Sequence, residues 1–136
     1  MGTLIGIGNI VAYAGGGGDS LVDVLDPLDF QSAQWIVVAG ASATGAKSFT
    51  TSSSGTGIYT NVSTPIIESG KSYSVTVTGL SALIEVRTRE ITSGAGTVIL
   101  SADGTAIYNA TGASPNIYLR ATDAGSHSVV TLTAFT

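Results

Sequence analysis

The sequence predicts an all-β fold, an antiparallel β-sandwich of the jelly-roll type with an extended N-terminal arm. Short runs of alternating apolar and polar residues recur after residue 34, and this two-residue period is that of a half-buried strand. Turn-forming residues separate the runs by roughly 8–12 positions, a spacing typical of sandwiches and barrels. No segment after residue 35 sustains the 3.6-residue period of a helix.

The chain divides into an arm, residues 1–33, and a sandwich domain, residues 34–136. The arm begins with an apolar, glycine-punctuated stretch from Leu4 to Ala14. Gly15 to Gly18 then form a flexible hinge. An acidic linker follows, in which aspartates alternate with Leu and Val before Pro27, and a short amphipathic helix is one alternative there. The arm cannot build a core by itself.

The predicted strands of the sandwich follow one another at short intervals. They cover, in order, residues 35–39, 49, 58–62, 71–78, 83–89, 97–100, 105–108, 117–121 and 128–135. The clearest alternation places Tyr73, Val75 and Val77 on one face of a strand and Ser and Thr on the other. Alternating strands favour antiparallel sheets over parallel ones, whose strands are apolar on both faces.

Asp103-Gly104 lies between two of these strands. Asp-Gly between β-rich runs predicts a hairpin, because a two-residue type I′ turn needs positive φ at both central residues. We therefore expect residues 97–100 and 105–108 to pair directly.

The composition indicates a protein whose surface is covered by other chains. Only 10% of the 136 residues are charged, whereas about 25% is usual. A soluble monomer ordinarily carries more charge than this, so we expect a homo-oligomer within a larger assembly. The net charge of −4 argues against a nucleic-acid partner. No apolar run approaches the ~18 residues of a membrane span, and no cysteine is present to form a disulfide.

Motifs that suggest phosphate or metal binding are each incomplete. The stretch from Gly40 to Ser48 resembles a phosphate-binding loop, but Ala46 separates the second glycine from Lys47, and no helix is expected to follow. The aspartates of the linker, which are Asp19, Asp23, Asp26 and Asp29, lack the glycine and the final glutamate of a calcium loop. We expect a Gly/Ser loop in the first case and a solvated acidic face in the second.

Acid–base catalysis also lacks its residues. His127 is the only histidine, and we expect it to be exposed in a turn before the last strand. Glu85 and Glu90 have opposite strand parity and therefore face opposite sides, so they do not form a carboxylate pair. We predict a protein that is not an enzyme and that holds no cofactor, metal or catalytic site.

Five aromatic residues have two interpretations, as core residues or as a platform that stacks on sugars. We expect Trp35 and Tyr73 to lie in the core or in an interface. Tyr59, Tyr108 and Tyr118 are candidate glycan contacts, and for these three the two interpretations stay open.

Taken together, residues 35–136 resemble the small carbohydrate-binding-type β-sandwich modules found in bacteriophage structural proteins. The resemblance rests on Trp35, on Ser54-Gly55-Thr56-Gly57-Ile58-Tyr59, on Ser69-Gly70-Lys71-Ser72-Tyr73 leading into Val75-Thr76-Val77, and on the closing strand from Ser128 to Phe135. The start, from Leu4 to Ile10 before a glycine cluster, is similar to the N-termini of virion proteins from phages of Bacteroidetes hosts.

The resemblance implies a structural protein located in the virion: a capsid decoration, a head fibre or a tail component. Its partners would be other virion proteins, further copies of itself and, on the outside, a surface glycan. The arm would dock on the capsid or tail through its apolar residues, which are Leu4, Ile5, Ile7, Ile10, Val11 and Tyr13. A glycan-binding module or adhesin is the alternative, and a small hydrolase, which would need a convergent acid–base set, is the third.

Overall fold

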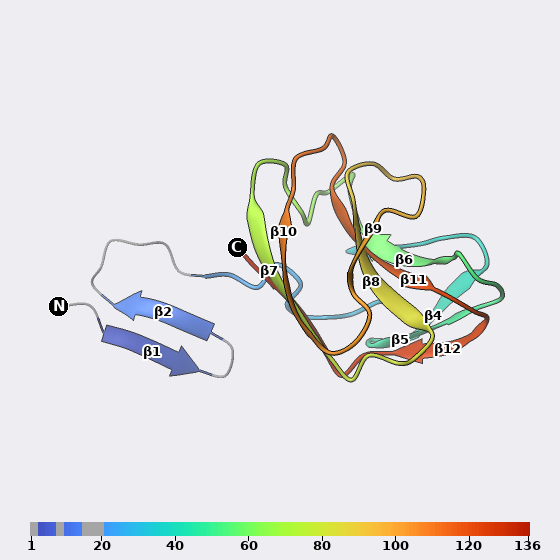
Figure 1. Cartoon of the computed structure of the whole chain (residues 1–136), viewed down its shortest axis with the longest axis horizontal. Helices are drawn as coiled ribbons and strands as arrows, with labels where there is room; N and C mark the ends of the chain where they lie inside the picture. The colour runs from blue at the N-terminus through green and yellow to red at the C-terminus, as the bar shows by residue number, and fades with distance from the viewer. Residues whose placement is uncertain (1–2, 8–9, 15–20) are drawn as a thin grey trace.

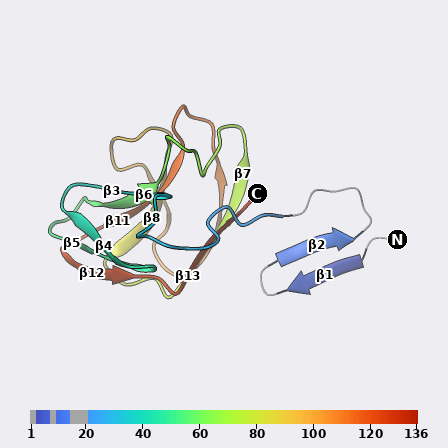
Figure 2. The same ribbon diagram turned by 180° about the vertical axis from the view of Figure 1, so that it is seen from behind.

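The structure, a computed structural model, describes the backbone of residues 3–7 and 10–14 and all of residues 21–136. The described residues contain strands and turns but no helix. Antiparallel sheets pack together in a sandwich-like arrangement, as Figures 1 and 2 show from opposite sides. The all-β prediction is therefore confirmed.

The strands are short, as the sequence predicts. They are β1 (Thr3–Ile7), β2 (Ile10–Ala14), β3 (Trp35–Val37), β4 (Ala41–Gly45), β5 (Ser48–Thr51), β6 (Gly57–Thr60), β7 (Ser72–Thr78), β8 (Ile84–Arg89), β9 (Thr97–Leu100), β10 (Gly104–Asn109), β11 (Asn116–Ala121), β12 (Gly125–Ser128) and β13 (Thr131–Phe135). Four of them differ from expectation. The strands β1 and β2 form in the predicted arm, and β4 falls in a stretch predicted as a loop. The strand β12 lies almost wholly in the turn predicted before the closing run, of which β13 takes residues 131–135.

The strands form four antiparallel sheets. Their orders are β3-β6-β11-β8-β9, β10-β7-β13, β12-β5-β4 and β1-β2. Four of the pairings are nested in the sequence, so that each pair of strands encloses the next pair. They are β5 with β12, β6 with β11, β7 with β10, and β8 with β9. Strands far apart in sequence are thereby brought side by side, and a single hydrophobic core forms between the sheets.

The core is built by strands with a two-residue period. On β7, Tyr73, Val75 and Val77 are buried, while the serines and threonines between them face outward, so the predicted alternation is confirmed. On β8 the same pattern buries Ile84 and Val86. Burying such side chains contributes about 1.5–3 kcal/mol each, which makes this alternation a principal source of stability.

Residues 21–33, which belong to the predicted arm, pack on the sandwich. The backbone N–H of Val24 donates to the carbonyl of Ala134 at 2.9 Å, so this segment lies against the edge of β13. Leu25 and Phe30 are buried in the core, where the Phe30 ring meets that of Trp35 edge-on with centroids 4.8 Å apart. The helix that we considered before Pro27 does not form.

The predicted hairpin at Asp103-Gly104 is wrong. The strand β9 pairs with β8 in the five-stranded sheet, whereas β10 pairs with β7 in the three-stranded sheet. The Asp103 carboxylate instead accepts hydrogen bonds from the backbone N–H groups of Gly79 and Leu80, both at 2.9 Å. These bonds lower the pKa of Asp103, and they join the connection between the sheets to the loop that follows β7.

The expectation that His127 is exposed in a turn is also wrong. His127 lies on β12 with 2% of its surface exposed, and its ring centroid is 5.2 Å from that of Phe49. Its Nε2 is hydrogen-bonded to the Thr51 hydroxyl at 2.8 Å. Burial disfavours the charged imidazolium and therefore lowers the pKa of His127 below 6.5.

The free energy of unfolding should therefore fall as the pH is lowered below about 6.5. The unfolded chain binds a proton at His127 in that range, while the folded chain resists doing so, which gives a slope of at most about 1.4 kcal/mol per pH unit. Urea denaturation at pH 7.5, 6.5 and 5.5 measures the slope. His127→Phe, which keeps an aromatic ring beside Phe49, should flatten it. Equal slopes in both proteins would contradict the assignment.

Candidate functional site

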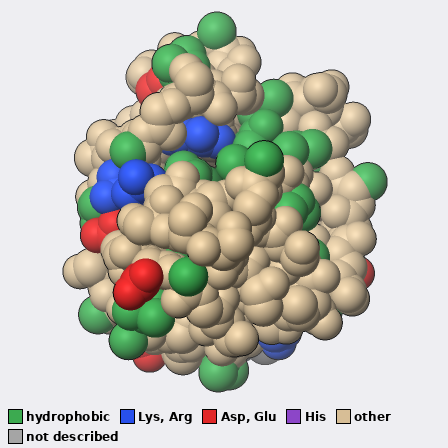
Figure 3. Space-filling view, turned by 90° about the vertical axis from the view of Figure 1, so that its right-hand side faces the viewer, with side chains coloured by type: hydrophobic (Ala, Val, Ile, Leu, Met, Phe, Trp, Pro, Cys, Tyr) green, Lys and Arg blue, Asp and Glu red, His purple; other side chains and the backbone are tan. Residues whose placement is uncertain are grey.

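A cleft of about 470 Å³ lies on the outer face of the five-stranded sheet, the face turned away from the core. It is bounded by β3 on one side and by the loop between β8 and β9 on the other, and β6 and β11 form its floor. Figure 3 shows two groups of basic side chains, one of which lies in a depression beside hydrophobic groups. Three other hollows, of about 260, 240 and 350 Å³, are smaller and are lined by no aromatic side chain.

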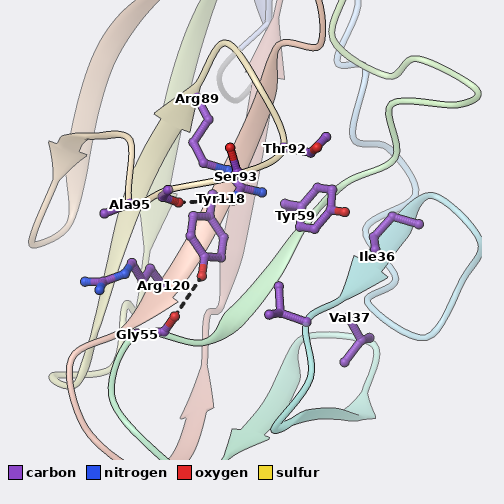
Figure 4. Close-up of a pocket in the computed structure, with 12 residues that line it drawn as sticks. Ile36, Val37, Gly55, Tyr59, Arg89, Thr92, Ser93, Ala95, Tyr118 and Arg120 are labelled. Carbon is purple, nitrogen blue, oxygen red and sulfur yellow. Dashed lines mark hydrogen bonds between the residues drawn. The ribbon is translucent and has the colours of Figure 1, made fainter.

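Two tyrosines form the aromatic part of the cleft. Tyr59 on β6 and Tyr118 on β11 are paired positions on neighbouring strands and lie side by side on one face of the sheet. Their ring centroids are 6.3 Å apart and their ring planes meet at 89°. The Tyr118 hydroxyl donates to the carbonyl of Gly55 at 3.3 Å, and its ring is buried. Tyr59 is half-buried and keeps part of its ring open to the cleft. Figure 4 shows both rings from the open side.

Arg89, the last residue of β8, lies over both rings. Its guanidinium carbon is 4.0 Å from the centroid of Tyr118 and 4.6 Å from that of Tyr59, a cation–π arrangement on two rings. Its Nε donates to Asn116 Oδ1 at 3.0 Å and its Nη1 to the carbonyl of Gly94 at 3.2 Å. Its Nη2 has no hydrogen-bond partner, although only 5% of the residue is exposed. Burial lowers the pKa of Arg89.

The loop after β8 is held over the sheet by side chains of the sheet itself. Asn116 is fully buried, and its Nδ2 donates to the carbonyls of Ile91 and Ser114 at 3.1 and 2.9 Å. Arg87 Nη1 donates to the carbonyl of Ala95 at 3.2 Å. Gly96 has a φ of +68°, and a Cβ there would lie 2.3 Å from the backbone oxygen of Thr88 on β8. Only glycine therefore allows the loop to come back so close to β8.

The cleft is positively charged in a chain whose net charge is −4. Arg89 and Arg120 both line it, and no Asp or Glu is among its described lining residues. Within residues 21–136, neither arginine makes an ion pair, whereas the neighbouring Arg87 is paired with Glu85 at 2.7 Å. Two guanidinium groups without carboxylates and a half-open aromatic ring are suited to holding an anionic ligand by charge and by packing.

Of the three candidate glycan tyrosines, the structure brings together Tyr59 and Tyr118. Tyr108 lies elsewhere: on β10 it is buried in the core, and its hydroxyl donates to the carbonyl of Arg89 at 3.0 Å. Burial and the nearby Glu90 carboxylate raise its pKa. Its ring therefore does not reach the cleft. The core placement of Trp35 and Tyr73 is confirmed.

The six predicted assembly residues lie on β1 and β2. Their backbones pair in one antiparallel hairpin, with Leu4 opposite Tyr13, Ile7 opposite Ile10 and Ile5 opposite Ala12. The role of their side chains in docking stays a prediction.

The stretch from Gly40 to Ser48 forms β4, a tight turn and the start of β5, with no helix after it. A phosphate-binding loop depends on the N–H groups of a following helix, so this geometry does not suit a nucleotide.

The described aspartates of the linker do not gather around a metal site. Asp23 Oδ1 accepts from the N–H groups of Leu25 and Ala134, and Asp29 Oδ1 accepts from that of Gln31, all at 3.0 Å. Within the described part of the chain, no three His, Cys, Asp or Glu residues lie close enough together to hold a metal ion. Asp19 lies outside the described residues.

Sequence reasoning missed Arg89, Arg120 and Asn116 as site residues. Part of the signal lies in the sequence, because Arg87 and Arg89 have the same parity on one predicted strand. The register of β8 with β11 then brings Arg120 to the same face, so that this face holds three of the five Lys and Arg residues. In a chain so poor in charge, that concentration on one sheet face is informative.

Comparisons with protein-family models, with curated proteins and with solved structures find no match to this chain. The residues that the structure describes include no helix of the length and apolarity needed to cross a membrane.

The Asn116→Ala substitution should lower the free energy of unfolding by at least about 2 kcal/mol. It would leave the carbonyls of Ile91 and Ser114 and the Nε of Arg89 without their buried partner, and each such loss costs roughly 1–3 kcal/mol. Chemical denaturation measures the change. The control is Asn109→Ala, at an exposed position on β10, which should stay within about 0.5 kcal/mol of the parent. Similar losses in both variants would contradict the bridging role of Asn116.

Proposed function

We propose that the chain is a non-enzymatic structural component of a bacteriophage virion, namely a capsid decoration, a head fibre or a tail component. In this proposal the N-terminal arm docks on neighbouring chains, which are other virion proteins and further copies of this chain, and the sandwich oligomerises or faces outward. The assignment to a virion rests on the resemblance of the sequence to bacteriophage structural proteins. The assembly role rests on the arm.

The observation that carries the assembly role is the pairing of β1 and β2. Among the described strands, these two pair only with each other. A two-stranded hairpin is marginally stable in water unless a further strand or surface covers it. Its sequence, TLIGI and IVAYA, contains no charged residue. Such a hairpin gains most by burying itself against another chain.

The outer face of the sheet β10-β7-β13 supports the same proposal. On β7 and β13 this face presents Ser and Thr, and Phe135 lies opposite Ser74. On β10 it presents Ile107, with 63% of its surface exposed. No residue of these strands is charged. Natural sheets usually place charges on exposed surfaces to prevent association, so their absence here favours contact with another subunit.

The sandwich itself is proposed to be a jelly roll. A jelly roll winds a long hairpin so that strand pairs are nested, which gives two four-stranded sheets from eight strands. The nested pairings of β5 with β12, β6 with β11, β7 with β10 and β8 with β9 support this topology. In this interpretation β12 and β13 are two halves of the last strand.

A second function, glycan binding, is favoured by the cleft. Tyr59 and Tyr118 lie together on one sheet face with guanidinium groups beside them, which is the combination of ring and polar group that sugars need. The two proposals are compatible, because a virion component displayed on the outside can also contact a surface glycan.

The assembly role predicts that a charge placed in the arm reduces oligomer formation. Ile5→Asp puts a carboxylate into the apolar hairpin, and Ala102→Asp adds the same charge in an exposed turn of the sandwich. Light scattering of the full-length chain should show a defined oligomer for the parent and for Ala102→Asp. Ile5→Asp and a chain lacking residues 1–18 should show a monomer or a smaller oligomer.

A monomeric parent protein would overturn the oligomer part of the proposal. An oligomer that Ile5→Asp and the truncation leave unchanged would place the self-association in the sandwich alone, and would overturn the contribution of the hairpin to it.

A further inference from the structure

We propose that the cleft over β6, β11 and β8 is a binding site for an acidic saccharide, with the carboxylate of the sugar on Arg89 and the sugar ring against Tyr59. The inference deepens the second proposed function and rests on sugar binding. It does not depend on the assembly role of the arm.

Arg89 is the residue that requires an anion. Only 5% of the surface of Arg89 is exposed, so its guanidinium has lost most of its hydration. A buried charge costs several kcal/mol unless a counter-charge or hydrogen bonds replace the water. The rings of Tyr59 and Tyr118 and two hydrogen bonds of Arg89 replace part of this lost hydration. Nη2 remains without an acceptor, and none of the described lining residues is a carboxylate. A ligand carboxylate would supply the missing acceptor and the missing charge.

The loop over Arg89 gives the ligand a route to the guanidinium. Figure 4 shows Ser93 beside the guanidinium, with Thr92 farther along the same loop. Thr92, Ser93 and Gly94 are exposed and small, and Arg89 itself holds the loop through one bond to the carbonyl of Gly94. A carboxylate that binds the planar guanidinium in two places can take over this bond at Nη1 and reach Nη2 when the loop shifts outward.

The remaining walls suit a sugar ring. The partly exposed ring of Tyr59 offers an apolar face for the C–H groups of a pyranose, and Thr92 and Ser93, whose side chains carry hydroxyl groups, line the same cleft. The volume of about 470 Å³ lies in the roughly 300–1,000 Å³ range of small-ligand sites. Together these features favour a saccharide over an inorganic anion.

Charge selects the acidic sugar over a neutral one. Arg120 also lines the cleft, and a Cβ at Gly55 would lie 3.1 Å from its Nη2, so this guanidinium lies beside Gly55. In Figure 4 it points away from Tyr59, which makes it a second positive charge at the edge of the cleft. The rest of the molecule is negative overall, because the chain has nine acidic and five basic residues. An anionic ligand is therefore attracted to this face and repelled by the others.

The test compares a trisaccharide of galacturonic acid with its fully methyl-esterified form and with inorganic sulfate. The full-length chain is titrated with each probe by calorimetry, and backbone and Arg Nε signals are followed by NMR. We expect the acid to bind at least about tenfold more tightly than the ester, because a guanidinium–carboxylate pair is a strong charge-assisted contact. The largest shifts should fall on Arg89 Nε and on Thr92 to Ala95.

Three variants, compared with one control, assign the binding to the cleft. Arg120→Gln removes one positive charge at its mouth, and the matched control Lys47→Gln removes one from an exposed position in a different hollow. We expect a loss of affinity of at least about threefold for Arg120→Gln and of less than about 1.5-fold for Lys47→Gln at low salt.

Arg89→Gln should abolish the preference for the acid over the ester. Thr92→Trp fills the cleft from an exposed position and should abolish binding, whether or not Arg89→Gln folds.

Each contrary result has a definite meaning. Equal binding of acid and ester in the cleft would overturn the acidic ligand and leave sugar binding standing. Sulfate that binds as tightly as the trisaccharide would show an anion site without sugar recognition. No binding of either saccharide would overturn the inference and the glycan-binding function together. Binding that Thr92→Trp leaves intact would overturn the assignment to this cleft.

Discussion

The pairing of β11 with β6 on one side and with β8 on the other fixes the core and the cleft in a single register. It turns Ile117, Leu119 and Ala121 into the core and Tyr118 outward beneath Arg89. The approach to β6 is so close that a Cβ at Gly57 would lie 1.8 Å from the carbonyl oxygen of Leu119. A slip of one residue would exchange the two faces, placing Tyr118 in the core and exposing its apolar neighbours. Folding and the formation of the cleft therefore depend on the same set of backbone hydrogen bonds.

The few charges of the chain are distributed unevenly, and this connects its two proposed roles. The strands β7, β10 and β13 carry none, while β8 and β11 carry three arginines on one face. A surface without charge associates readily with another protein surface, whereas an unpaired guanidinium in a hollow attracts an anion. One molecule can thus offer one side to its assembly and another to a ligand.

Local patterns predicted the strands well, and failed where the answer depended on partners distant in sequence. The alternation around Tyr73 was sufficient to locate β7, because period and burial are properties of one segment. The turn signal at Asp103 did not reveal that β9 and β10 join different sheets, since pairing is decided by β7 and β8. His127 and Arg89 are polar residues that the tertiary structure buries, the first beside Phe49 and the second under a loop. The local sequence pattern does not indicate that these two side chains are buried, because their burial depends on segments distant in sequence.

The short segment at the root of the arm has a mechanical consequence. Asp23 forms an isolated β-bridge with Phe135. The backbone N–H of Val24 donates to the carbonyl of Ala134, and that of Thr136 donates to the carbonyl of Val22. Tension applied through a tethered arm would reach the sandwich first at these three contacts and then at the buried Leu25. The load would pass into β13 and, through its pairing, into β7 at the centre of its sheet. The segment would thus distribute a pulling force over β13 and β7, which belong to a different sheet from the strands beneath the cleft.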